Sequence, residues 1–262
     1  MIYSELYRIT KSYKGKAIIL LILTMQIVDI LINFLGNVYD YTNIPSSELY
    51  HPAYAAFLSS SSQGHICQIL LFWILPLYFL IAYSDSAVTD YNTKYSNCVI
   101  SRIGSRKYYF SKISTAFIFP FFITFISLVI NFIICFLIFR NGQSFANLES
   151  YVNNLSYLFK ICIQHPYISY FIYICIFSLI SGFTGILGVC VSSITRNYFI
   201  TYPLIFFLWL LQIASKYSIT YTFQPFIEYG FKYFIIGFIR CFFITTISVI
   251  LLYVKRIQKD EI

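Results

Sequence analysis

Two ionisable side chains lie well inside long apolar stretches of this sequence, Asp29 in the first stretch and Arg240 in the last. An ionisable group at the centre of a bilayer costs about 2.5–3.5 kcal/mol on insertion scales, so it normally faces protein or water. The chemistry that fits this placement is an intramembrane ion pair between Asp29 and Arg240, which we state as a hypothesis. A proton-driven carrier would need several such acids, and Asp29 alone is thin support for that class.

A second concentration of charged side chains lies in a polar segment, Ser84 to Lys112, between two apolar runs. Read as one helix, this segment carries an apolar stripe at steps of three and four residues: Val88, Tyr91, Tyr95, Cys98 and Val99. Bases crowd its second half, namely Arg102, Arg106, Lys107 and Lys112. Such a helix either docks on a cytoplasmic partner or rests on the lipid surface, and its periodicity does not separate the two interpretations.

Motifs of catalysis and nucleotide binding are missing from the sequence. It has no GxxxxGK[ST] phosphate loop, no HExxH, no GxSxG and no pair of acids within one apolar stretch. The seven cysteines are scattered without a CxxC pair, and His51, His65 and His165 fall in or beside polar segments. We therefore expect no enzymatic activity, no cofactor and no metal site in this chain.

The composition indicates a polytopic membrane protein. Of the 262 residues, 59% are hydrophobic and 11% are charged, whereas a soluble domain carries about a quarter charged residues. The net charge of +8 would also suit a nucleic-acid-binding protein, but the bases lie beside the apolar runs. Their placement favours the positive-inside rule and contact with anionic lipid, so we expect no nucleic-acid partner.

Hydropathy predicts one all-α transmembrane domain over residues 1–262, with six spans. The predicted spans are 17–36, 66–83, 113–139, 167–194, 198–215 and 231–254. Pro76 and Pro120 should bend or loosen the second and third spans. Before the first span, Ile2, Leu6, Ile9 and Tyr13 repeat at helical spacing, which predicts an N-terminal interfacial helix; a frayed basic tail is the alternative.

Two further features concern the packing and the outside segments. Small residues gather in the fourth span at Ser181, Gly182, Gly185 and Gly188, which favours close approach of another helix over mere tolerance of glycine. A short helix over 53–58, opened by Pro52, is expected in the outside loop between the first two spans.

Charge also predicts the orientation. Thirteen of the eighteen Lys and Arg residues fall in the segments that share a side with the N-terminus, four fall on the other side, and Arg240 is intramembrane. The positive-inside rule therefore places both termini in the cytoplasm.

The segment from Thr89 to Ile113, TDYNTKYSNCVISRIGSRKYYFSKI, resembles the corresponding segment of ABC-2 type permease subunits of ABC transporters. Its ending, Ser101 to Arg106, resembles the Ser-Arg-x-x-Ser-Arg-like ending of that family, and Tyr108, Tyr109 and Lys112 match the tyrosine and the lysine that come after this ending in the family. Asp90 stands where an acid is usual. Tyr95 in place of the usual glycine and Ile103 in place of a frequent proline depart from the family pattern.

The resemblance implies a permease that pairs with a second permease chain, identical or related, in a bacterial plasma membrane. A separate ATPase subunit would bind ATP–Mg²⁺ and dock on a coupling helix, which points to Asp90, Tyr91, Lys94, Tyr95, Cys98, Arg102 and Arg106. The translocation path in the family points to Met25, Asp29, Phe72, Pro76 and Phe207. The expected cargo is a peptide, a bacteriocin or a lipid-like molecule. The alternative is a stand-alone immunity or binding protein that acts without ATP.

Overall fold

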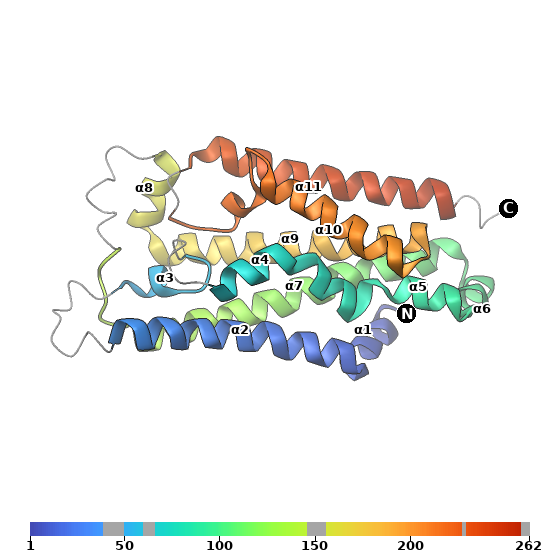
Figure 1. Ribbon diagram of the computed structural model, residues 1–262, viewed down its shortest axis with the longest axis horizontal. Coiled ribbons are helices and arrows are strands. Elements are labelled where there is room, and N and C mark those ends of the chain that lie inside the picture. The colour runs from blue at the N-terminus through green and yellow to red at the C-terminus, as the bar shows by residue number, and fades with distance from the viewer. Residues whose placement is uncertain (39–49, 60–65, 146–155, 227–228, 258–262) are drawn as a thin grey trace.

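The fold is a bundle of long helices that run roughly along one common axis (Figure 1). The computed structural model describes residues 1–38, 50–59, 66–145, 156–226 and 229–257. Within these ranges the chain is helical and has no β-strand; one isolated bridge joins Tyr50 to Ser144. The prediction of an all-α membrane protein is confirmed at this level.

Five helical stretches of the described chain are long and apolar enough to cross a membrane. They are Tyr13–Ile32 within α2 (Tyr13–Val38), Ile66–Asn92, α7 (Ser105–Ile138), α9 (Pro166–Thr195) and Phe231–Arg256, which begins with α11 (Phe231–Leu252). The remaining predicted span corresponds to α10 (Tyr198–Ala214), an apolar helix of 17 residues. A short amphipathic helix, α1 (Ile2–Lys11), precedes α2, at the position of the predicted interfacial helix.

The stretch Ile66–Asn92, which contains the second predicted span (66–83) and extends beyond it, is a composite of three pieces. The helix α4 (Ile66–Phe79) contains Pro76, passes into a π-helical turn at Leu80–Ser84, and is followed by α5 (Ser86–Asn92). Pro76 has no N–H to donate to the carbonyl of Phe72, one helical turn earlier. The indole Nε1 of Trp209, on α10, donates to that carbonyl at 2.9 Å instead. The loosening expected at Pro76 is thus stabilised by a neighbouring helix.

The polar segment 84–112 is not one helix, and the prediction of a continuous apolar stripe along it is wrong. The chain leaves α5 through Lys94, which adopts a left-handed backbone with φ 58°, and then forms α6 (Tyr95–Ile103). Gly104, with φ 83°, separates α6 from α7, an angle that favours glycine. As a result α7 begins at Ser105 rather than near Ile113, and α5 and α6 form a bent projection at one end of the bundle (Figure 1).

At the opposite end, residues 52–59 insert between the long helices. The helix within them, α3 (Pro52–Ala55), is shorter than the predicted 53–58, and Ala53, Ala56, Phe57 and Leu58 are fully buried. The backbone N–H of Phe57 donates to Asn131 Oδ1 on α7, and that of Leu58 donates to the Tyr170 hydroxyl on α9. Residues 52–59, which were expected in an outside loop, are therefore part of the core. Another short helix, α8 (Tyr157–Gln164), covers this end beside the start of α9.

The most buried of the long helices is α9, and its small residues let two neighbours approach. A side chain at Gly185 would collide with the backbone carbonyl of Ala116 on α7, and one at Gly182 would collide with the ring of Phe117. Gly188 lies against Ser84 of the π-helical turn, and Ser181 is fully buried. This close approach fixes α7 and the end of α4 relative to α9.

Candidate functional site: a buried ion cluster

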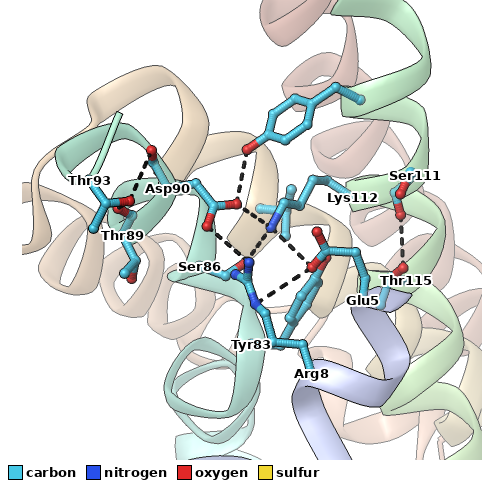
Figure 2. Close-up of polar contacts among 12 residues, drawn as sticks. Glu5, Arg8, Tyr83, Ser86, Thr89, Asp90, Thr93, Ser111, Lys112 and Thr115 are labelled. Carbon is cyan, nitrogen blue, oxygen red and sulfur yellow. Dashed lines mark hydrogen bonds and ion pairs between the residues drawn. The ribbon is translucent and has the colours of Figure 1, made fainter. Parts of the chain in front are cut away.

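The described chain brings four charged side chains together where α1, α5 and α7 meet, a group that we call the ion cluster: Glu5, Arg8, Asp90 and Lys112 (Figure 2). Glu5 and Arg8 come from successive turns of α1. Glu5 shares the buried face of that helix with Ile9, and both are almost completely covered. An acid on the apolar face of an amphipathic helix requires a partner in the surface beneath it.

Lys112 of α7 is that partner, and its side chain is fully buried. Its Nζ lies 3.2 Å from Glu5 Oε2 and 2.6 Å from Asp90 Oδ2, and it donates to Ser86 Oγ at 3.1 Å. These three oxygens match the three N–H donors of an ammonium group. One buried cation therefore joins the N-terminal helix to the segment that follows α4.

Arg8 and two tyrosines also contact the two acids. Arg8 Nη1 donates to Asp90 Oδ1 at 3.0 Å, and its Nε lies 3.8 Å from Glu5 Oε2. The hydroxyls of Tyr83 and Tyr108 donate to Glu5 and Asp90 at 3.2 and 3.1 Å. Two acids and two bases make the ion cluster formally neutral.

Burial and charge act in opposite directions on Arg8. Partial burial lowers the pKa of its guanidinium, but the nearby carboxylates of Glu5 and Asp90 more than offset this, and the net shift of the pKa is upward. Arg8 therefore stays charged at every physiological pH. Removing one member of such a buried set leaves an uncompensated charge, which typically costs about 3–5 kcal/mol.

A second set of contacts ties the same region to α9 and α10. Asp85 accepts from the Tyr202 hydroxyl at 3.1 Å and lies 3.6 Å from Lys14 Nζ. Arg196, at the α9–α10 turn, places its guanidinium 4.1 Å from the ring centroid of Tyr91. A cavity of about 340 Å³ lies between α1 and the α4–α5 segment, and Arg8, Lys14, Asp85 and Asp90 all line it.

The residues predicted for ATPase docking divide into two groups. Those on the surface of α5, α6, their connection and the first turn of α7 are exposed: Tyr91, Lys94, Tyr95, Cys98, Arg102 and Arg106. Asp90, by contrast, is 3% exposed, and its carboxylate is enclosed by the ion cluster. It positions α5 and does not offer a surface to a partner.

The residues predicted for a translocation path are not gathered around one space. Phe72 is buried against Phe177 and Phe223, and Pro76 is buried one turn further along α4. Phe207 is 59% exposed on α10. On α2, Asp29 is buried, and Met25 is half-buried with its Sδ 3.9 Å from the Tyr78 hydroxyl.

The structure does not form the hypothesised pair of Asp29 and Arg240. Arg240 donates to Ser215 Oγ and, through Nη2, to the carbonyls of Gln212 and Tyr217 at 2.7 and 2.8 Å. These carbonyls lie at and just after the C-terminal end of α10, where helical acceptors lack backbone partners. In addition, α2 and α11 lie on opposite edges of the bundle (Figure 1). No ion pair of the described residues joins these two side chains.

Sequence reasoning missed the ion cluster itself. It used Arg8 and Lys112 in the topological charge count, used Lys112 also in the family resemblance, assigned Asp90 to ATPase docking, and gave Glu5 no role. One signal was present: Glu5 falls three residues after Ile2 and four before Ile9, inside the apolar stripe of the N-terminal helix. A charge in that register predicts a buried partner, although its identity comes from packing across distant parts of the chain.

Comparison with known proteins found one well-covered relative. Over 229 residues the chain is 36% identical to "Uncharacterized protein YybM" of Bacillus subtilis (strain 168), and the match covers 87% of each chain. No family model and no solved structure matches the chain.

Proposed function

The chain belongs to the same family as YybM of Bacillus subtilis, and we propose that it is the permease subunit of an ATP-driven exporter. In this proposal a separate ATPase docks on the α5–α6 projection, and a second permease chain completes the transporter. The observation that carries the proposal is the mechanical attachment of this projection to the spans. Its exposed face is available to a partner, while its inner face is fixed to α1 and α7 by the ion cluster.

The attachment supports transmission of force because both ends of the projection continue into long helices. Through α5, the projection joins α4 by way of the π-helical turn, and α6 leads directly into α7 at Gly104. Asp90 binds Lys112 of α7 and Arg8 of α1. A push on Tyr91, Tyr95 or Arg102 would therefore displace α4 and α7 together, because separating the ion cluster is costly.

The arrangement of the helices supports six spans with both termini on the cytoplasmic side. The beginning of α1 and the end of α11 lie at the same end of the bundle as α5 and α6 (Figure 1). Both ends of the described chain can share one side only if it crosses an even number of times, so the proposal counts α10 as a crossing beside the five longer stretches. The bases Arg8, Lys11 and Lys14 of this end fit the cytoplasmic side of a bacterial plasma membrane.

The test is co-purification with an ATPase encoded beside this chain. Tyr95→Ala and Arg102→Glu should abolish retention of the ATPase and the stimulation of its ATP hydrolysis. Phe199→Ala is the matched control, because Phe199 is 90% exposed at the same end of the bundle but lies on α10. If both docking variants still retain the ATPase, the docking role of α5–α6 is refuted. If the purified chain protects or binds its target fully without any ATPase subunit, the exporter proposal is refuted, and a stand-alone immunity or binding protein is favoured.

The cargo in this proposal is a peptide, a bacteriocin or a lipid-like molecule. Because the described segments at the end opposite α5 and α6 are short or buried in the bundle, they offer little surface for a large extracellular receptor domain. Transport of a labelled amphipathic peptide by the reconstituted complex is the corresponding measurement.

A further inference from the structure

A groove of about 340 Å³ runs along α9, α10 and α11, away from the ion cluster. Its walls are Leu187 and Val191 of α9, Leu204 and Leu208 of α10, and Ile247 and Leu251 of α11, among others. The helices α10 and α11 both pack on α9 but diverge from each other toward the end that carries α5 and α6 (Figure 1). The groove is the space left between these two diverging helices, with α9 as its floor.

The walls offer little to a polar ligand. Two hydroxyl-bearing residues line the groove, and both hydroxyls donate to backbone carbonyls of their own helices. Thr195 donates to Val191 at 2.9 Å, and Ser248 donates to Thr245 at 2.7 Å. A polar molecule in the groove would lose its hydrogen bonds to water without replacement. The chemistry of the walls therefore fits a hydrocarbon chain.

One end of the groove carries positive charge. The wall residues Ile244, Ile247 and Leu251 lie on α11, and Lys255 follows four residues after Leu251, in the π-helical turn Tyr253–Ile257 that continues this helix, where it is exposed. Beside it, Arg256 donates through Nε to the carbonyl of Ser193 at 3.2 Å and through Nη2 to that of Ile194 at 2.8 Å. Because Ile194 is itself a wall residue, the guanidinium is held at the mouth of the groove.

We propose that this groove binds one acyl chain of an anionic phospholipid, whose phosphate lies at Lys255 and Arg256. The basic residues at the mouth match the anionic headgroup, and the apolar walls beyond them match the acyl chain that follows the headgroup. A lysine at the end of a span places its ammonium at the headgroup level, where anionic lipids concentrate near bases. The lipid source is the membrane that surrounds α9, α10 and α11, so no further partner is required.

The position of the site gives the lipid a role in the fold. It holds α10 and α11 apart just beside the α9–α10 turn, where Arg196 contacts the ring of Tyr91 on α5. Occupancy of the groove would therefore set the position of this turn against the α5–α6 projection. The proposal does not depend on the ATPase, since it concerns a lipid bound by this chain alone.

Native mass spectrometry of the purified full chain tests the proposal, with phosphatidylglycerol and phosphatidylcholine as the two probes. The wild-type protein should retain phosphatidylglycerol with a preference of about fivefold, because both lipids carry a phosphate but only phosphatidylglycerol has a net negative charge, and one base near an anionic headgroup contributes about 1 kcal/mol. Lys255→Gln should remove that preference, and Leu208→Trp should abolish retention of both lipids because the indole fills the groove. The matched controls are Lys107→Gln, exposed at the start of α7, and Leu211→Trp, exposed on α10 outside the groove.

Three results would overturn the proposal. Equal retention by Leu208→Trp and the wild type would place the lipid elsewhere. Equal retention of the two lipids by the wild type would remove the role of the basic mouth. A cross-link to a second copy of this chain from a photo-reactive residue placed at position 208 would show that a protein helix, and not a lipid, occupies the groove.

Discussion

Two buried polar regions of this protein are held together in different ways. At one end, the ion cluster joins α1, α5 and α7 through four charged groups. At the other end, residues 52–59 are held by neutral groups: Asn131 and Tyr170 accept from the backbone of Phe57 and Leu58, and the Gln68 amide donates to the Leu58 carbonyl at 3.1 Å. Each neutral bond contributes modestly, whereas each charge depends on the whole set.

The difference indicates which end is suited to movement. Charged groups that share several partners can exchange them without exposing an unpaired charge, as long as the set stays together. Arg8 is part-exposed and already bridges both acids, so it can follow a shift of α5. In the neutral segment, the N–H groups of Phe57 and Leu58 each bind one acceptor, and both side chains are fully buried. We therefore expect motion at the ion cluster and rigidity around residues 52–59.

The largest expected effect is that of Lys112→Met. It keeps most of the side-chain volume but leaves Glu5 and Asp90 with Arg8 as their remaining cation, so the stability should fall by about 3–5 kcal/mol. Thermal unfolding in detergent, followed by the fluorescence of Trp73 and Trp209, measures this loss. Lys107→Met, at an exposed position of the same helix, should leave the unfolding temperature unchanged. An equal effect of both substitutions would show that charge burial is not the cause.

The next effect isolates the charge interaction from simple packing. In a Glu5→Gln background, Lys112→Met should cost less than in the wild type, because one of the two uncompensated charges is already gone. The coupling energy should fall in the range of about 0.5–3 kcal/mol that contacting residues show. Strictly additive losses in the four-protein cycle would mean that Glu5 and Lys112 do not act as a unit.

Around residues 52–59, removal of a single neutral group should lower the stability by less than the loss of Lys112 does. Tyr170→Phe deletes the hydroxyl that accepts from the buried Leu58 N–H, which should cost about 1–3 kcal/mol. Hydrogen exchange of residues 52–59 is the second measurement, and protection should fall there while α5 stays unchanged. A drop confined to α5 would reverse the proposed contrast between the two ends.

Hydropathy predicted the presence of the long helices, because a span needs a sustained apolar run, but it placed the starts of α2 and α7 too late, since both helices begin in polar residues. The fourth predicted span, 167–194, differs from α9 by one residue at each end. The break at Lys94 was missed because the amphipathic stripe continues across it in sequence, and backbone angles are not visible in a periodic pattern. The ion cluster was missed for a different reason. Glu5 and Lys112 are far apart in the chain, and their contact follows from the packing of α1 on α7.

The smallest expected effect is a pH dependence of the stability, caused by His51 beside residues 52–59. His51 caps α3, since its Nδ1 accepts from the Ala53 N–H at 3.2 Å, and its ring stacks on Phe145. Burial lowers the pKa of His51 below its ordinary value of 6.5. The unfolded chain therefore takes up the proton first, and stability is lost as the pH falls through the ordinary value.

The loss between about pH 7.5 and about pH 5.5 should be about 1 kcal/mol or less, since one pKa unit corresponds to about 1.4 kcal/mol. It should disappear in His51→Asn, which keeps a capping acceptor but does not titrate. Unfolding temperatures of the two proteins across this range provide the measurement, with Lys107→Met as a variant that should keep the wild-type pH profile. If His51→Asn shows the same pH profile as the wild type, the titration belongs to another group, and residues 52–59 are insensitive to protons as well as mechanically rigid.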